Sequence, residues 1–192
     1  MYKKLYEIAD IHPGYPFRGS IPSEKSGTVH VVQVRDTRKT GKILLDKIIK
    51  TNLSGKKAPN WLQNGDILFV AKGAKHYSAL VEELPKDTVC SPHFFLIRIK
   101  KEYRHKVNPE FACWQLNQLP AQKYFIASAE GSLYLSIRKG VLENTPIKLI
   151  GIEQQQVVAN MNKCAVKKQA LLQQLIENIQ KEQTAISLEL LN

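Results

Sequence analysis

The sequence predicts an α+β fold: a mixed-sheet domain over residues 1–152, followed by one long C-terminal helix of the coiled-coil type over residues 153–192. Three observations support this prediction. Runs rich in Val, Ile, Leu and Phe, bounded by Gly, Pro, Asn or Asp, recur through the first part and are typical of strands. Two segments between these runs carry helix-start signals. After Gly151, neither Gly nor Pro occurs again, and apolar residues repeat every seven positions.

The apolar runs are the predicted strands of the domain. Each is of strand length and ends at turn-forming residues. They are residues 4–11, 28–35, 43–50, 66–71, 78–83, 93–100 and 145–150.

The stretch "IHPGYPFRGSIP", residues 11–22, is predicted to be a shaped loop. It holds three prolines and two glycines, with Tyr15, Phe17 and Arg18 between them. Pro lacks a backbone N–H and Gly tolerates positive φ, so neither a helix nor a central strand is expected to continue here.

Two short helices are predicted between the sixth and seventh strands. "NPEFACWQLNQL" begins with Asn108 as N-cap, Pro109 at the first helical position and Glu110 in the first turn. "PAQKYFIASAEG" begins at Pro120 and meets Gly131 as a C-terminal stop.

The C-terminal helix carries an apolar stripe that it cannot bury against itself. At about 1.5 Å per residue its forty residues span roughly 60 Å. A partner helix is expected to cover the stripe, with folding back onto the domain as the alternative. The broken second seam, with Lys168, Glu182 and Glu189 at its other positions, favours a mixed or flared bundle over a strict zipper. The predicted dimerisation residues are Val158, Met161, Ala165, Leu172, Leu175, Ile179 and Ile186.

Charge is concentrated in the domain. Residues 153–192 hold four Lys and four Glu, so their net charge is zero, whereas the first 152 residues carry 24 Lys and Arg against 13 Asp and Glu, which is the whole net charge of +11. A basic body on a neutral tail predicts binding to a polyanion. An ordinary basic protein without such a partner is the alternative.

Enzyme motifs do not support catalysis. Nucleophile-elbow, phosphate-loop and H-E-x-x-H patterns are absent, as are the motifs of an adenine methyltransferase. A metal-dependent nuclease built on Asp66 and Lys72 is an alternative, but Val70 occupies the position where such a site needs a carboxylate. Without C-x-x-C spacing, Cys90, Cys113 and Cys164 indicate thiols in a reducing cytoplasm. No metal, cofactor, signal segment or membrane span is expected.

Three basic loops are the predicted contacts with nucleic acid, because Arg and Lys neutralise phosphates while Arg, Ser and Tyr can also reach base edges. Solvated turns without a ligand are the alternative. The candidates are Arg35, Arg38, Lys39 and Lys42 in "RDTRKTGK"; Lys72, Lys75, His76 and Tyr77 in "AKGAKHY"; and Ser132, Tyr134, Arg138 and Lys139 in "GSLYLSIRKG".

In their order, these motifs resemble the DNA-specificity (S) subunits of Type I restriction-modification systems. The resemblance rests on "LYEIADIHPGYPFRGS", "VVQVRDT", "WLQNGDILFVAKGA", "CSPHFFLIRIK", "NPEFACWQLNQL", "AEGSLYLSI" and "TPIKLIGIEQQQVVANM". It implies a target-recognition domain that reads one half of a bipartite DNA site, on a helix that sets spacing and docks methyltransferase subunits. It also implies that Phe17 anchors in the core while Arg18 and Ser20 face DNA.

The sequence departs from the family pattern in two respects. It has one recognition domain and one helix, where S subunits have two of each, and so resembles a half-length form. The Leu-Pro usual before Glu153 and Gln154 is missing.

The predicted function is therefore a cytoplasmic, non-catalytic specificity subunit. It would bind double-stranded DNA, act as a homodimer through its helix, and dock an adenine methyltransferase subunit with or without a restriction subunit. Two alternatives stay open: a helical adaptor that binds DNA only within the complex, and a metal-dependent nuclease.

Overall fold

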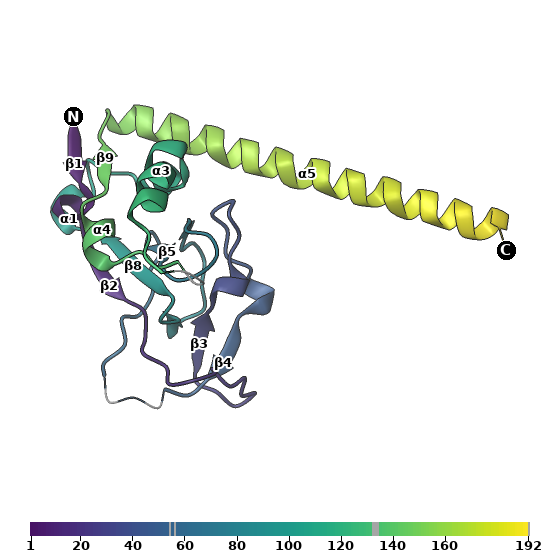
Figure 1. Ribbon diagram of the computed structural model, residues 1–192, viewed down its shortest axis with the longest axis horizontal. Helices are drawn as coiled ribbons and strands as arrows, with labels where there is room; N and C mark the ends of the chain where they lie inside the picture. The colour runs from purple at the N-terminus through teal and green to yellow at the C-terminus, as the bar shows by residue number, and fades with distance from the viewer. Residues whose placement is uncertain (54, 56, 132–134, 192) are drawn as a thin grey trace. The chain divides into compact units, whose positions relative to one another are not determined.

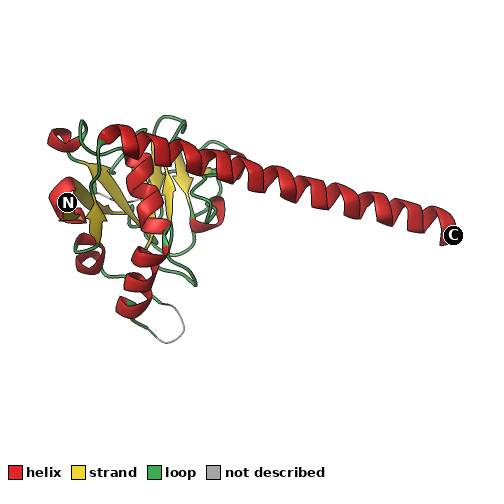
Figure 2. Ribbon diagram, turned by 90° about the horizontal axis from the view of Figure 1, so that it is seen from above, coloured by secondary structure: helices red, strands yellow, loops and turns green. Residues whose placement is uncertain are grey.

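The computed structural model describes residues 1–53, 55, 57–131 and 135–191. The chain divides into two compact units, Met1–Gln156 and Val157–Asn192. The first unit holds every strand named below, and the second consists of the greater part of the long helix (Figures 1 and 2).

The first unit alternates short strands with short helices. Single 3-10 turns, Val34–Asp36, Leu45–Lys47 and Lys101–Tyr103, lie in its connections. In chain order its elements are β1 (Tyr2–Lys4), α1 (Leu5–Ile8), β2 (Ala9–Pro13), β3 (Val29–Val32), β4 (Ile49–Thr51), β5 (Ile67–Val70), β6 (Ser78–Leu80), β7 (Thr88–Cys90), β8 (Phe94–Ile99), α2 (Pro109–Asn117), α3 (Leu119–Ser128), α4 (Lys139–Glu143) and β9 (Pro146–Lys148).

The strands form three small sheets. The largest is antiparallel, in the order β2-β8-β5-β6, with Leu68 of β5 opposite Leu96 of β8. The second, β4-β3-β7, is mixed, because β3 runs antiparallel to β4 and parallel to β7. The third is the pair β1-β9, which joins the two ends of the first unit. The α+β, mixed-sheet prediction is confirmed.

Strand β5 is buried on both faces, which explains its uninterrupted apolar run "ILFV". On one face Ile67 and Phe69 pack against apolar side chains of α2 and α3, and the rings of Phe69 and Phe125 lie 4.8 Å apart between centroids. On the other face Leu68 and Val70 join a second cluster with Val32 of β3. This strand therefore links the helices to the second sheet.

Three of the predicted strands differ from the structure. In residues 28–35, β3 ends at Val32 and Val34–Asp36 form a 3-10 turn. Residues 4–11 were expected to be one strand, but Leu5–Ile8 form a single helical turn, which the Glu7 carboxylate stabilises by accepting the Lys4 N–H at 2.6 Å. Residues 43–50 contain a 3-10 turn, so apart from an isolated bridge between Ile43 and Thr37 the strand begins only at Ile49. Strand β7 was not predicted, because its three residues are too few to show alternation.

Glycine permits a close approach in the loop after β2. A Cβ on Gly14 would lie 2.0 Å from the Ser91 carbonyl oxygen, so any larger residue would push this loop off the sheet. The neighbouring Tyr15 N–H donates to the Cys90 carbonyl at 2.8 Å. The predicted loop over residues 11–22 therefore begins only at Gly14, because Ile11–Pro13 continue β2, which pairs with β8 at the edge of its sheet. The start of this loop is held against the end of β7.

The long helix α5 spans Ile152–Leu191, and its first turn belongs to the first unit. There Gln155 is fully buried. Its amide nitrogen donates to the carbonyls of Lys106 and Ile150, each at 2.8 Å, and its oxygen accepts the Asn108 N–H at 2.9 Å. Asn108 also donates to Gln156 at 2.8 Å. These bonds fix the start of α5 through side-chain amides.

Within the described residues, we find no helix with the length and apolar character needed to cross a membrane.

Candidate nucleic-acid interface

Hydrogen bonds join the three predicted basic loops. The Thr37 and Tyr77 hydroxyls lie 2.8 Å apart, which links residues 35–42 to residues 71–77. The Gly73 N–H donates to the Leu135 carbonyl at 3.3 Å, and the Ile137 N–H to the Ala71 carbonyl at 2.9 Å, which links residues 71–77 to the third loop. Segments a hundred residues apart in the chain thus meet on one surface of the first unit.

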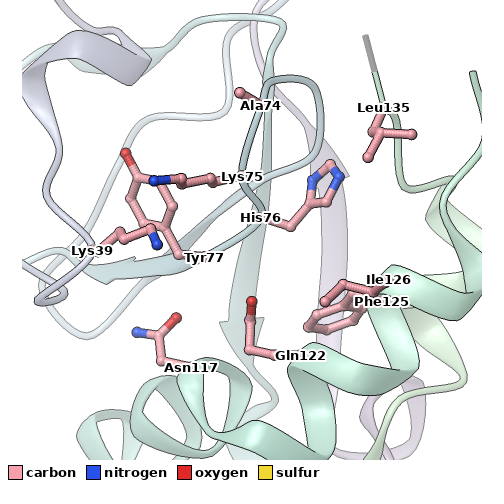
Figure 3. A pocket seen from close by; sticks show the side chains of 10 residues that line it. All are labelled: Lys39, Ala74, Lys75, His76, Tyr77, Asn117, Gln122, Phe125, Ile126 and Leu135. Atoms are coloured by element: carbon pink, nitrogen blue, oxygen red, sulfur yellow. The ribbon is translucent and has the colours of Figure 1, made fainter. Parts of the chain in front are cut away.

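A pocket of about 320 Å³ lies where these loops meet helices α2 and α3. Figure 3 shows Lys39, Lys75 and Tyr77 on one side and His76, Phe125, Ile126 and Leu135 on the other, with Asn117 and Gln122 below. The pocket therefore has a cationic side and an apolar side.

Lys39 and Lys75 form the cationic side. Repulsion from the Lys75 ammonium group is the main cause that lowers the pKa of Lys39 from its usual range, with a smaller contribution from desolvation. Neither lysine is paired with a carboxylate among the residues that the structure describes. Two cations held side by side without a counter-ion form a site that attracts an anion.

Packing beneath the pocket holds the middle loop in place. The buried His76 ring contacts the Val70 carbonyl through Nδ1 at 3.0 Å and stacks beside Phe69 at 6.3 Å between centroids. Because a carbonyl only accepts, Nδ1 carries a proton in this contact. His76 therefore supports the loop more than it offers a contact to DNA.

Helix α2 fixes the neighbouring strand through one side chain. The Asn117 amide accepts the Ser78 N–H at 2.7 Å and donates to the Ser78 carbonyl at 2.9 Å, so it pairs with β6 as another strand would. The pocket floor is consequently tied to the sheet.

The other predicted residues of the first loop do not line this pocket. Arg35 is largely exposed, with Nε 3.7 Å from the buried Asp36 carboxylate. Arg38 donates to the carbonyls of Arg35 and Thr37, which holds its guanidinium against its own loop. Lys42 lines a different pocket beside Glu82 and Glu83. Only Lys39 of this loop lies in the two-sided pocket.

In the third loop, both predicted cations have acidic neighbours. Arg138 forms an ion pair with Glu130, and Lys139 lies 3.3 Å from Glu143. Both pairs are exposed, so they weaken rather than abolish the positive field. Lys72 is exposed and pairs with Ser136 through its backbone. Ser132 and Tyr134 lie outside the described residues.

Arg18 and Ser20 do not line this pocket. Both are exposed, and the segment before them is anchored on the mixed sheet, where Tyr15 packs with Val29, Val31 and Val89 and Phe17 covers that cluster. Phe17 thus occupies the anchoring position that the resemblance implied.

Sequence reasoning missed the helical residues of the pocket. Gln122 and Ile126 lie four residues apart on α3, and Ile126 leaves 72% of its surface exposed. An exposed apolar residue on a helix gives no signal by itself. Only the position of α3 beside the loops reveals it.

Asp66, the acid of the nuclease alternative, has a structural role. Its two carboxylate oxygens accept Nε and Nη2 of Arg98 at 2.8 and 2.6 Å, and it also accepts the Gln63 N–H at 2.8 Å. Arg98 further donates to the Trp61 carbonyl at 2.8 Å. This bidentate pair raises the pKa of Arg98. In the described parts of the chain, no three His, Cys, Asp or Glu side chains gather as metal ligands would.

The cysteines show no sign of a reactive centre in the first unit. Burial raises the pKa of both Cys90 and Cys113 to about 12, so their thiols stay protonated near neutral pH. Cys164 is exposed on α5.

The predicted dimerisation residues of α5 expose their apolar side chains. Met161, Leu172, Leu175, Ile179 and Ile186 each leave about half or more of their surface exposed. Ala165 is also exposed, whereas Val158 is partly buried. An apolar stripe of this length on one helix is typical of a surface that another helix covers.

These features define a class of fold: a small mixed-sheet domain whose loops carry cations, continuing into a long helix with an exposed apolar stripe. Solved structures of Type I restriction-modification S subunits have this fold. The S subunit from M. genitalium matches with a TM-score of 0.61 at 17% identity, and the HsdS subunit from Thermoanaerobacter tengcongensis with 0.59 at 22%. A structure described as showing the assembly and conformational transition of the type I R-M system matches with 0.66 at 23% identity.

The matches cover 94–95% of this chain but only 42–46% of each of those chains. The chain thus spans less than half the length of the S-subunit structures that it resembles. The predicted S-subunit fold is confirmed over nearly the whole length of this chain. No protein-family model matches the sequence, and no curated protein matches it.

Proposed function

We propose that this chain is a specificity subunit of a Type I restriction-modification system and binds double-stranded DNA through its basic loops. The observation that carries the proposal is the meeting of three basic loops around an uncompensated lysine pair. The fold shared with S subunits supports it, as does the confinement of the net charge of +11 to residues 1–152. Phosphate contacts from the loops would set the register, and other side chains would read bases.

In this proposal each chain reads one half-site, and two chains pair through α5. A homodimer related by a two-fold axis would bind two inverted copies of one half-site around an unread spacer. The apolar stripe of α5 supports this pairing. Forty helical residues span roughly 60 Å, against about 34–36 Å for one turn of DNA, so half-sites one turn or more apart are within reach.

The chain would have no catalytic role of its own. Methylation would come from an adenine methyltransferase subunit docked on the complex, and cleavage from a restriction subunit. The ion pair between Asp66 and Arg98 supports a non-catalytic role, because Asp66 is the acid on which the nuclease alternative depends.

The test is binding to a random duplex pool at low salt, followed by titration with salt. We expect the pool to be enriched in one half-site. A plot of the logarithm of affinity against the logarithm of salt concentration should be a falling straight line. We call its steepness the salt slope, and expect about 0.9 for each phosphate that the chain contacts. Binding that is indifferent to salt, or absent from the pool, would remove the DNA-binding claim.

The exposed stripe of α5 favours a second candidate, a helical adaptor that binds DNA only together with its methyltransferase. The same assay with and without the methyltransferase subunit separates the two. A chain that enriches a half-site alone is a reader of DNA. A chain that does so only in the mixture is an adaptor.

A further inference from the structure

The pocket where the loops meet has an apolar side that phosphate binding does not explain. Its cationic side, Lys39 and Lys75, suits a phosphate. Its other side is formed by Phe125, Ile126 and Leu135, whose apolar atoms gain nothing from a phosphate. A ligand that fits both sides carries an anion and an apolar group close together.

Among the groups of duplex DNA, the thymine methyl meets this description. It is the one apolar group that a base pair presents in the major groove, and apolar side chains recognise it there. It lies on the backbone side of its base, near the phosphates of its own strand. Cytosine has only a hydrogen at C5 beside its N4 donor, and guanine presents the N7 and O6 acceptors, so apolar side chains at this edge would gain no methyl contact and would leave those polar atoms unpaired.

The polar side chains at the pocket are bound to the protein itself, which leaves the apolar side of the pocket as the part that can contact a ligand. Both atoms of the Asn117 amide are used by Ser78, and the Gln122 amide nitrogen donates to the Leu116 carbonyl at 2.8 Å. Ile126 and Leu135, by contrast, remain exposed, by 72% and 37% of their surface. Their exposed apolar atoms are the part of the pocket that a ligand can cover without a change in the fold.

We propose that this pocket reads a thymine of the target: Ile126 and Leu135 contact its C5-methyl group, while Lys39 and Lys75 hold a phosphate of the same strand. This inference rests on the proposed function, since it names the base that one part of that interface selects. Ile126 is then a specificity-determining residue, and the two lysines are phosphate-binding residues.

The experiment uses the full chain and a duplex that it selects from the random pool. Each thymine of that duplex is replaced in turn by uracil, which lacks only the methyl group. For one thymine we expect affinity to fall about fourfold, the loss given by one buried methyl group. Ile126→Ser should make the thymine and uracil duplexes equal at that position, and Ile126→Val should keep the preference.

The lysines are tested on the same duplexes. Lys39→Ala combined with Lys75→Ala should weaken binding to the thymine and uracil duplexes equally, and reduce the salt slope by about one, because the two lysines hold one phosphate. The control is Lys148→Ala, which removes an exposed lysine from β9, outside the pocket. It should leave the thymine preference intact and change the slope less.

The outcomes separate the two proposals. A selected duplex without a fixed thymine, or one whose thymine-to-uracil ratios are the same for the wild type and Ile126→Ser, overturns the inference and leaves the proposed function standing. An unchanged salt slope in the double lysine variant also overturns it. If the wild type binds no duplex, the proposed function itself fails.

Discussion

The two units of this chain differ in which side chains they leave exposed. The first unit buries its large apolar residues in continuous clusters and collects the net charge on its surface. The second is a helix with four Lys against three Glu, so it is nearly neutral, and leucines and isoleucines are exposed along it. The first unit therefore lacks only a counter-charge, whereas the helix lacks an apolar partner. Disturbing either unit should leave the other unit's property intact.

The largest expected effect comes from charging the helix stripe. Leu172→Glu combined with Leu175→Glu would place two carboxylates in any interface that covers the stripe, where an unpaired charge is costly. Self-association measured by analytical ultracentrifugation should weaken by about 100-fold or more. The melting temperature of the first unit should not change.

A matched pair on the other side of the helix serves as control. Gln174→Glu combined with Gln180→Glu adds the same charge outside the two apolar seams, so association should persist. Equal loss of association in both double variants would mean that net charge, rather than the stripe, governs pairing. A wild type that is monomeric at micromolar concentration would remove the homodimer.

The second effect is confined to the first unit. Asp66→Ala leaves Arg98 without its bidentate partner and the Gln63 N–H without an acceptor. Breaking a buried pair from one side costs about 3 kcal/mol. Urea denaturation should show that loss, and Asp46→Ala, which removes an exposed carboxylate, should show almost none. A stable Asp66→Ala variant that had lost a Mg²⁺-dependent nicking activity would instead revive the nuclease alternative.

A smaller effect is expected where the helix begins. Asn108 caps α2 by accepting the N–H groups of Glu110 and Phe111 at 2.8 and 3.2 Å, and donates to Gln156 of α5. Asn108→Ala should lower the free energy of unfolding by about 1 kcal/mol, the usual worth of an N-cap. Asn108→Asp keeps the cap and should recover most of it. Equal losses in both variants would place the energy in the contact with Gln156.

Sequence patterns predicted the structural elements that depend on residues close together in the chain. The heptad repeat gave the long helix because its period is a property of consecutive residues, and Asn108-Pro109 marked the start of α2 for the same reason. The basic loops were visible as composition. Their meeting was not, because it depends on the bond between Thr37 and Tyr77 and on pairing between residues 71–73 and 135–137.

Tertiary neighbours decided the rest. Arg138 reads as a free cation in the sequence, but the fold brings Glu130 to it. Asp66 reads as a candidate catalytic acid until β8 places Arg98 against it. Nothing in the sequence marks Ile126 as a site residue, because only the fold places it in the same pocket as Lys39 and Lys75. Site residues are therefore less predictable than elements, because each depends on a partner distant in the sequence.

The smallest expected effect concerns a buried carboxylate at the base of the first basic loop. Asp36 has no exposed surface, and its Oδ2 accepts the Gln33 N–H at 2.8 Å. Desolvation raises its pKa, against the opposing influence of that bond and of Arg35. The folded chain therefore holds this proton to a higher pH than the unfolded chain does. The free energy of unfolding should fall as pH rises from about 4, the ordinary value, through the raised pKa, and this contribution should be constant above it.

Asp36→Asn isolates that contribution, because its amide oxygen can still accept the Gln33 N–H while no charge is buried. Urea denaturation of both proteins over this pH window should show the variant gaining stability relative to the wild type as pH rises. A difference between the two that is independent of pH would mean that the Arg35 and Gln33 contacts balance desolvation, and a difference of the opposite sign would mean that they outweigh it. In that case the charge on Asp36 would stabilise the loop that carries Lys39, and its burial would serve the interface itself.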